Sequence, residues 1–263
     1  MKKPVIVTLC LLSLFVLSFA DNVAAYNPAF THTDYMGSAS PTIDGKYTTA
    51  DEYAAGASHG FGTNGVFRDT WTIPANVMEN MILETMDTSN DATDNYVICY
   101  DSTADGGTTP KTDDFKIVVT GHGTSATCIW YRGTGTAWTQ VAAPTSAFFE
   151  WKESLATSPT SSTAHNMVEF RIDKQDTTAF GITVLGMNFA MSVSYNDTRT
   201  GGNGVQSWPP SANANNPDTW GYVPYSMEPV PEFLSLSLVF ALSTIAVVAG
   251  TICIRKKIVL PKF

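Results

Sequence analysis

The chain lacks the motifs of the common catalytic and nucleic-acid-binding classes. It contains no Gly-x-Ser-x-Gly elbow, no His-Glu-x-x-His pair and no phosphate-binding loop, so nothing in the sequence marks a hydrolase, a metalloprotease or a nucleotide-binding protein. Basic residues are also scarce, with 9 lysines and arginines against 22 aspartates and glutamates between Tyr26 and Glu228. Because phosphate recognition needs clustered cations, we expect no nucleic-acid partner.

Cysteine is nearly absent as well. Cys10 and Cys253 lie in apolar terminal segments, which leaves Cys99 and Cys128 in the middle of the chain. No Cys-x-x-Cys pair exists, and this excludes a zinc knuckle and a c-type haem attachment site. An even count in an oxidising exterior favours a Cys99–Cys128 disulfide. Two buried free thiols in strands that never meet are the alternative.

The first long apolar run opens the chain. Lys2 and Lys3 precede an apolar region that reaches Ala20. Small residues near Ala20 and Ala25 supply the pattern that a signal peptidase needs. Residues 1–25 are therefore predicted to be a secretory signal peptide, cleaved after one of these two alanines, and the rest of the chain is predicted to be exported.

The second long apolar run, residues 233–254, lies near the C-terminus and carries no charge. Its roughly 22 residues, at about 1.5 Å each, would form a helix of about 33 Å, enough to cross a hydrocarbon core of about 30 Å. Arg255, Lys256 and Lys257 follow directly. The positive-inside rule then places the tail 255–263 in the cytoplasm and the preceding domain outside the cell.

A Pro-rich spacer, residues 225–232, precedes this run, and the tripeptide Pro231-Glu232-Phe233 marks their junction. The order of spacer, tripeptide, apolar helix and basic cluster resembles the PEF-type C-terminal sorting signals (PEF-CTERM) of archaeal surface proteins. The resemblance implies that an archaeosortase, a membrane-embedded cysteine transpeptidase, recognises and cleaves this end. An ordinary single-span anchor is the alternative. Both interpretations predict a membrane-anchored cell-surface protein with an extracellular ectodomain.

Short β-type runs separated by Gly, Thr, Ser, Asn and Asp fill residues 26–224. Their alternation and their β-branched and aromatic content predict an antiparallel β-sandwich. Ser154–Thr163, rich in Ser, Thr and Pro, is predicted to be an exposed loop. The predicted strands are Val66–Ile73, Val77–Met86, Asn95–Asp101, Asp114–Thr120, Thr127–Arg132, Ala147–Trp151, His165–Asp173 and Gly186–Tyr195.

A second resemblance covers roughly residues 37 to 224. The Ile43-Asp44-Gly45 turn and the acidic, aromatic segment after it are similar to the opening of the family 9 carbohydrate-binding modules and their broader DOMON-like sandwich superfamily. The resemblance implies a carbohydrate-binding-module-like jelly roll. Its segments are Pro41–Lys46, Asp51–Tyr53, Tyr96–Asp101, Asp113–Ile117, Met167–Ile172, Gly186–Tyr195, Trp208-Pro209 and Pro217–Gly221.

Aromatic residues are the candidate ligand contacts, because a sugar-binding sandwich stacks pyranose faces on Trp or Tyr rings. The resemblance implies a pair of aromatic walls in loops at one edge of the sandwich. The candidates are Trp71, Trp138, Trp151 and Trp208, of which Trp71 and Trp208 are favoured because each borders a predicted loop. The alternative is that these rings pack in the core or at its rim.

Acidic pairs in three segments offer the oxygen ligands that calcium takes in a shell of six to eight. None has EF-hand spacing, and solvated acidic loops are the alternative. Some members of the family hold structural calcium, so we leave that ion open and expect no other metal or cofactor. Asn196-Asp197-Thr198 is an N-glycosylation acceptor. The acidic pairs are Asp91 with Asp94, Asp101 with Asp105, and Asp113 with Asp114.

Two further function classes deserve comparison with a binding module. Some relatives of this sandwich carry a b-type haem between one His and one Met, which would make the protein a surface electron carrier. Paired carboxylates could instead make it a surface glycosidase. The haem candidates are His59, His122, His165, Met78, Met167 and Met191, and the carboxylate candidates are Glu150, Glu153 and Glu169.

The sequence as a whole predicts a non-catalytic cell-surface binding or envelope protein. Its expected partners are an archaeosortase, the membrane, and envelope or extracellular glycans. The predicted order of parts is a signal peptide (1–25), an all-β sandwich ectodomain (26–224), a Pro-rich spacer (225–232), a transmembrane sorting helix (233–254) and a basic cytoplasmic tail (255–263).

Overall fold

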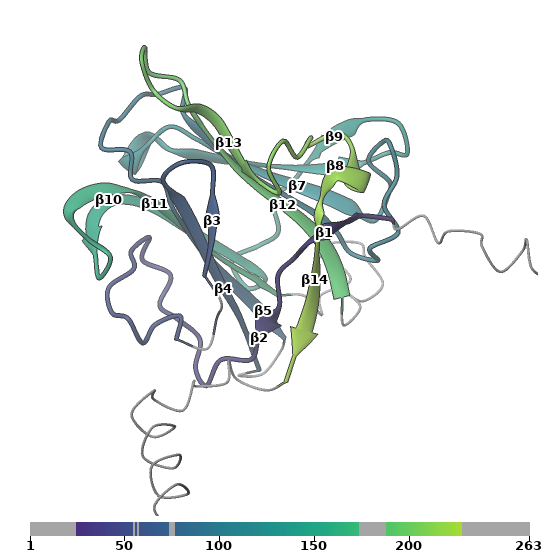
Figure 1. Cartoon of the computed structure of the whole chain (residues 1–263), viewed down its shortest axis with the longest axis horizontal. Helices are drawn as coiled ribbons and strands as arrows, with labels where there is room; N and C mark the ends of the chain where they lie inside the picture. The colour runs from purple at the N-terminus through teal and green to yellow at the C-terminus, as the bar shows by residue number, and fades with distance from the viewer. Residues whose placement is uncertain (1–24, 55, 57, 74–76, 174–187, 228–263) are drawn as a thin grey trace, which may run out of the picture.

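Two β-sheets packed face to face make up the described part of the chain (Figure 1). A computed structural model describes residues 25–54, 56, 58–73, 77–173 and 188–227. Within these ranges the secondary structure is β-strand, apart from two short 3-10 helices, η1 (Gly123–Ser125) and η2 (Pro217–Thr219). The predicted all-β sandwich is therefore confirmed.

The larger sheet has nine strands, and its central pairings are antiparallel. Phe115, Ile117 and Val119 alternate with half-buried residues along one strand, which is the period-2 pattern of a sheet with one buried face. Two strands pair beside the main path, β13 (Gly204–Trp208) with β12 and β2 (Asp34–Tyr35) with β14. The main path runs β1 (Asn27–Thr31), β14 (Gly221–Ser226), β12 (Asn188–Asp197), β6 (Asn95–Asp101), β7 (Asp114–Thr120), β8 (Thr127–Gly133) and β9 (Trp138–Val141).

The smaller sheet has five strands and ends at the edge strand β10, whose Phe149 packs on Trp130 of the larger sheet's β8. A long hairpin joins β10 to β11 (Figure 1). The spatial order is β10 (Phe149–Ser158), β11 (Ser161–Asp173), β5 (Met78–Glu84), β4 (Gly65–Thr72) and β3 (Ser58–Phe61).

Aromatic rings connect the two sheets across the core. Phe115 of β7 stacks on Trp130 of β8 with ring centroids 5.5 Å apart. Trp130 in turn meets Phe149 of β10 edge to face at 4.7 Å. All three side chains are buried, and each contributes about 1.5–3 kcal/mol by leaving water. This column fixes the start of β10 against the larger sheet.

The segment before β3 covers the outer face of the smaller sheet. Tyr47 and Tyr53 pack there on Ile82 and Met167. Glu169 of β11 accepts hydrogen bonds from the Tyr53 hydroxyl and from backbone amides of the Ile-Asp-Gly turn. The opening segment of the family resemblance is therefore a cover for this face.

One predicted loop is wrong. Ser154–Thr163 forms the outer half of the β10–β11 hairpin, with Leu155 opposite Asn166 and Ser158 opposite Ser161. Its Ser and Thr side chains alternate along a solvated hairpin, so they lack the buried apolar face on which sequence-based strand prediction depends. For the same reason, the strand predicted to end at Trp151 continues to Ser158, and the strand predicted to begin at His165 begins at Ser161.

The predicted disulfide is also wrong, since Cys99 and Cys128 are free. Cys99 lies opposite Lys116 and Cys128 opposite Val119, so β7 separates the two cysteines. Two strand spacings already exceed about 9 Å, whereas bridged cysteines need Cα atoms within about 7 Å. The side chains also face opposite ways, because Cys99 packs in the outer cluster of Trp220 and Cys128 packs against the inner core.

The terminal predictions lie outside the described residues. This applies to residues 1–24 of the predicted signal peptide, to Pro231-Glu232-Phe233, and to the predicted helix and tail at 233–263. Among the residues that the structure does describe, no helix is long and apolar enough to cross a membrane.

Candidate functional site

A pocket of about 460 Å³ opens where the edge strand β10 faces the end of the larger sheet. Six of its eight lining residues are apolar or aromatic, although polar atoms make up more of the exposed wall. β10 and the connection before it supply most of the lining, and Cys128 of β8 closes the far side. The lining residues are Ile43, Cys128, Ala143, Pro144, Ser146, Phe149, Glu150 and Trp151.

Strand alternation explains how Trp151 reaches this pocket. Phe149 and Trp151 are two residues apart in β10 and point to the same face, toward the core. Phe149 is buried against Trp130. Trp151 lies farther toward the open edge, where it packs against the core with part of its side chain and stays half-buried. The rest of its surface lines the pocket.

A fixed carboxylate lies at the rim. The Glu150 side chain is 44% exposed and forms an ion pair of 2.8 Å with Arg171 on the neighbouring strand. Arg171 also donates to Asn80 Oδ1 at 3.3 Å and to the carbonyl of Pro41. Because three partners hold the guanidinium, Arg171 gives the Glu150 carboxylate a defined position. Adjacent residues of a strand point to opposite faces, so Glu150 reaches the pocket from the other face of β10 than Trp151.

The two favoured tryptophans lie in the interior. Trp71 is 5% exposed, donates its Nε1 hydrogen to the Ser226 carbonyl and packs on Tyr225. Trp208 is 4% exposed and packs on Phe67 at 5.3 Å. Neither ring has a face open to a sugar, so their proximity to loops was a misleading signal.

Trp138 is half-buried and lies on the outer face of the larger sheet. Its ring is nearly parallel to that of Trp220 with centroids 6.4 Å apart, and the Lys116 ammonium lies 4.8 Å from its centroid. Its Nε1 donates to the Ala214 carbonyl at 3.0 Å. The structure therefore places Trp138 away from the Trp151 pocket and in contact with other side chains of this face.

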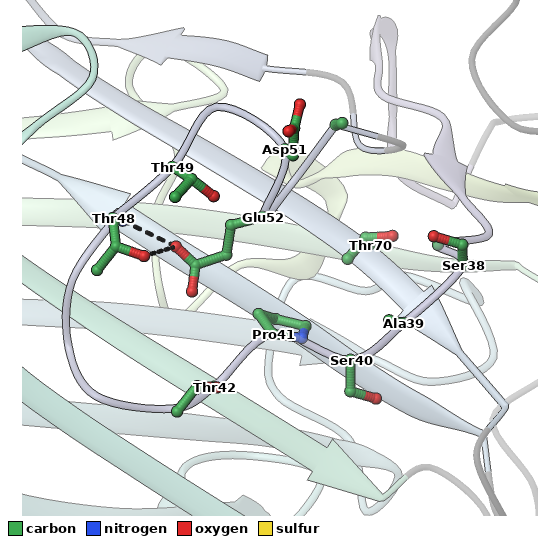
Figure 2. A pocket seen from close by; sticks show the side chains of 12 residues that line it. Ser38, Ala39, Ser40, Pro41, Thr42, Thr48, Thr49, Asp51, Glu52 and Thr70 are labelled. Carbon is green, nitrogen blue, oxygen red and sulfur yellow. Dashed lines mark hydrogen bonds between the residues drawn. The ribbon is translucent and has the colours of Figure 1, made fainter.

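A second pocket, of about 310 Å³, is polar and has no aromatic lining (Figure 2). The segment from Gly37 to Ala54 forms it together with Thr70. Glu52 Oε2 accepts hydrogen bonds from the amide and the hydroxyl of Thr48 at 2.8 and 3.1 Å, so this carboxylate ties the pocket's own loop together (Figure 2). Without a ring to stack on, this pocket fits a sugar less well.

The histidines proposed as haem ligands already have partners. His122 is bonded through Nδ1 to Glu153 at 2.8 Å and faces Asp94 through Nε2 at 3.3 Å. Both ring nitrogens of His165 are bonded as well, one to Glu84 and one to a backbone carbonyl. His59 is half-buried and packs edge to face on the His32 ring at 4.5 Å. Haem binding at His122 or His165 would require breaking these bonds.

Two of the glycosidase candidates, Glu153 and Glu169, do not face each other. Glu153 lies opposite Val168 in the β10–β11 ladder and Glu169 lies opposite Lys152, so the two carboxylates point to opposite faces of the sheet. Glu169 is fully buried, and this burial raises its pKa to about 7. Its three hydrogen bonds give it a structural role.

The Asn196 acceptor site lies at the end of a strand. Asn196 is half-buried in β12 between Asn95 of β6 and Val205 of β13. The hydroxyl of Thr198 donates to Asp94 Oδ1 at 2.7 Å. This acceptor site therefore lies at the end of a strand. Glycosylation of Asn196 stays a prediction.

No protein-family model and no curated protein matches the chain. The chain is similar in structure to a solved protein, which is a carbohydrate-binding module of family 9 from Caldicellulosiruptor kristjanssonii in complex with glucose. The sequence identity is 16%, the match covers 76% of this chain and 99% of that module, and the TM-score is 0.47.

Proposed function

We propose that the protein is a non-catalytic binding protein of the cell surface that holds a glycan at the Trp151 pocket. The observation that carries this proposal is the half-buried Trp151 ring in an open pocket, which Glu150, held by Arg171, also lines. Stacking the C–H face of a sugar on an aromatic ring removes apolar surface of both from water, which favours binding. A carboxylate can accept hydrogen bonds from the sugar hydroxyls. The pocket thus combines the two kinds of contact that a pyranose needs.

Replacing Trp151 by alanine is expected to weaken glycan binding about 10- to 100-fold, since burying an aromatic side chain contributes about 1.5–3 kcal/mol. A glycan array with the full chain first identifies the ligand, and isothermal titration calorimetry then compares the variants. Trp138→Ala is the matched control, because it removes a half-buried tryptophan from the outer face of the other sheet and should leave affinity unchanged. Loss of binding in Trp138→Ala but not in Trp151→Ala would reject the pocket.

We propose further that this domain is exported, anchored in the membrane and processed at its C-terminus by an archaeosortase. The support is the order of the Pro-rich spacer, Pro231-Glu232-Phe233, the uncharged run 233–254 and the basic cluster after it. The acidic composition of the ectodomain suits a salty exterior.

Deleting Pro231-Glu232-Phe233 is expected to stop C-terminal processing. Intact mass of the native protein extracted from its membrane should show a loss of the segment after this tripeptide in wild type and its retention in the deletion. Removal of the signal peptide should be the same in both, which serves as the internal control. An unchanged mature mass after the deletion would leave an ordinary anchor as the account of this end.

A further inference from the structure

The chain leaves the described domain at one corner of the sandwich, where strands of both sheets end together (Figure 1). β14 of the larger sheet ends at Ser226, whose carbonyl accepts a hydrogen bond from Trp71 Nε1 of β4 at 3.0 Å. The Met36 amide donates to the same carbonyl at 3.1 Å. Met227 follows Ser226 directly, and Ile73 comes two residues after Trp71. We call residues 36–40, 72–73, 77–78 and 226–227 the tether corner.

The tether corner exposes apolar side chains. Five large apolar residues are exposed in the described part of the chain, and two of them lie here, Ile73 at 55% and Met227 at 61%. Met36, Val77 and Met78 are half-buried beside them. Exposed apolar residues that occur singly need no explanation, whereas a group of them indicates a surface that something covers.

The tether corner also carries no charged residue, although the domain around it is acidic. Between Tyr26 and Glu228 the chain has 9 basic and 22 acidic residues. The acidic β6–β7 connection lies toward the opposite end of β14, because its Gly107 amide donates to Asp218 shortly before that strand begins. Anionic headgroups repel acidic surfaces, so this uncharged corner is the part of the domain that approaches a lipid surface most easily.

The length of the connection to the predicted helix keeps this corner close to the membrane. Only residues 228–232 separate Met227 from the uncharged run 233–254. The six steps from Met227 to residue 233, at no more than about 3.6 Å each, span at most about 22 Å. The headgroup layer takes up roughly 5–7 Å of this distance on each side of the hydrocarbon core. The tether corner therefore stays within reach of the lipid surface.

We propose that the tether corner rests on the lipid surface and buries the Ile73 and Met227 side chains among the headgroups. This inference rests on the membrane anchor proposed above. Apolar side chains enter the boundary between headgroups and acyl chains because burial there removes their surface from water. Since the tether already holds the domain beside the lipid, two side chains are enough for a contact that would be weak in a free domain.

Contact at this corner gives the domain a fixed orientation. In the smaller sheet, Leu155 pairs with a residue of β11 that lies seven positions from the partner of Met78. In the larger sheet, Val205 pairs with Asn196, eight residues from Asn188 at the end of β12 that pairs with the end of β14. At about 3.3 Å a residue, these distances along the strands are roughly 23–26 Å. The exposed Leu155 and Val205 therefore lie far from the lipid surface.

The test uses the full chain in phosphatidylcholine vesicles that carry a nitroxide quencher on the lipid headgroup. Every cysteine except the buried Cys99 is replaced by serine, and a bimane fluorophore is attached to one introduced cysteine at a time. The labels in Ile73→Cys and Met227→Cys should lose fluorescence to the nitroxide and shift their emission to the blue. The labels in Leu155→Cys and Val205→Cys, which are also exposed apolar positions, are the matched controls and should show neither change.

A second set of variants removes the apolar contact while the label stays in place. The label is attached in Ser38→Cys, an exposed polar position of the tether corner, and should be quenched. Ile73→Asp together with Met227→Asp should release the corner and restore the fluorescence of this label. Leu155→Asp together with Val205→Asp adds the same two charges far from the corner and should leave the quenching unchanged.

Flotation of the vesicles after an alkaline wash separates this inference from the membrane anchor. A chain that does not float with the vesicles lacks the anchor, and that result overturns both. A chain that floats, but whose labels at positions 73 and 227 are quenched no more than those at 155 and 205, overturns this inference alone. Emission that shifts to the blue without quenching and depends on the protein-to-lipid ratio also overturns it, since a second copy of the chain then covers the corner.

Discussion

His122→Ala is expected to lower the free energy of unfolding by about 3–5 kcal/mol, a large part of the total of about 5–15 kcal/mol for a domain. His122 is 7% exposed and lies between two carboxylates, Glu153 at 2.8 Å and Asp94 at 3.3 Å. Glu153 is 3% exposed and Asp94 0%. Removing the imidazole leaves two buried carboxylates facing an empty space.

The same contact joins the two sheets. Glu153 belongs to β10 of the smaller sheet, whereas Asp94 precedes β6 and His122 follows β7 in the larger one. The Gly123 amide also donates to Glu153, and the Tyr195 hydroxyl donates to Asp94 at 3.0 Å. Glu153 is two residues from the pocket's tryptophan on the same strand. We therefore expect the variant to loosen the edge at which the pocket opens.

The loss of stability in His122→Ala should depend on pH. Burial lowers the pKa of His122, but the hydrogen bonds to Glu153 and Asp94 outweigh burial, so the pKa lies above the ordinary value of 6.5. A pKa that is higher in the folded state means that the folded protein binds the proton more tightly. The contribution of protonated His122 to the free energy of unfolding is therefore complete below pH 6.5 and is lost as the pH rises through the folded-state pKa of this histidine.

Urea unfolding between pH 5.5 and 9 measures this directly. Wild type should lose stability above pH 6.5, and the His122→Ala profile should be flatter across that window. His59→Ala is the control, because burial lowers the pKa of His59 and its loss cannot remove the same dependence. Parallel profiles for wild type and His122→Ala would show that His122 does not hold a proton between the sheets.

The strands that the sequence predicts well are those with a buried face. Asn95–Asp101 and Asp114–Thr120 match β6 and β7 to the residue, since β-branched and aromatic side chains alternate there against one core. The short outer strands β1, β3, β9 and β13 were missed. Their partners are far away in the chain or their side chains are exposed, so no local pattern marks them.

The candidate site was only partly predictable. Trp151 was one of four candidate tryptophans, and the only local signal, proximity to predicted loops, favoured Trp71 and Trp208 instead. What distinguishes it is its place on an edge strand, which depends on the order of strands in the sheet. The Glu150–Arg171 pair likewise requires the β10–β11 register. The position of Trp151 and the Glu150–Arg171 pair both depend on contacts between segments that are distant in the sequence, so no local pattern predicts them.

Glu169→Ala is the other substitution with a large expected effect. The Glu169 carboxylate accepts hydrogen bonds from the Tyr53 hydroxyl at 2.8 Å and from the Asp44 and Gly45 amides at 2.9 Å each. At about 1–3 kcal/mol for each donor left without an acceptor, we expect a loss of about 4 kcal/mol or more. The segment that covers the smaller sheet would lose its anchor, and Tyr53 would lose its hydroxyl partner.

Glu169→Gln separates the hydrogen bonds from the charge. Its amide oxygen can still accept both turn amides, so the variant should cost only about 1 kcal/mol, the value of one lost hydrogen bond. Burial raises the Glu169 pKa from 4.5 to about 7, so wild-type stability should fall as the pH rises from 4.5 to about 7, where the folded state must give up its extra proton. Urea unfolding at pH 4.5 and 7.5 should show this fall in wild type and a smaller one in Glu169→Gln. An equal fall in the stability of wild type and Glu169→Gln would contradict this prediction. It would mean that Glu169 stays ionised in the folded protein and that the Asp44 and Gly45 amides bind a carboxylate.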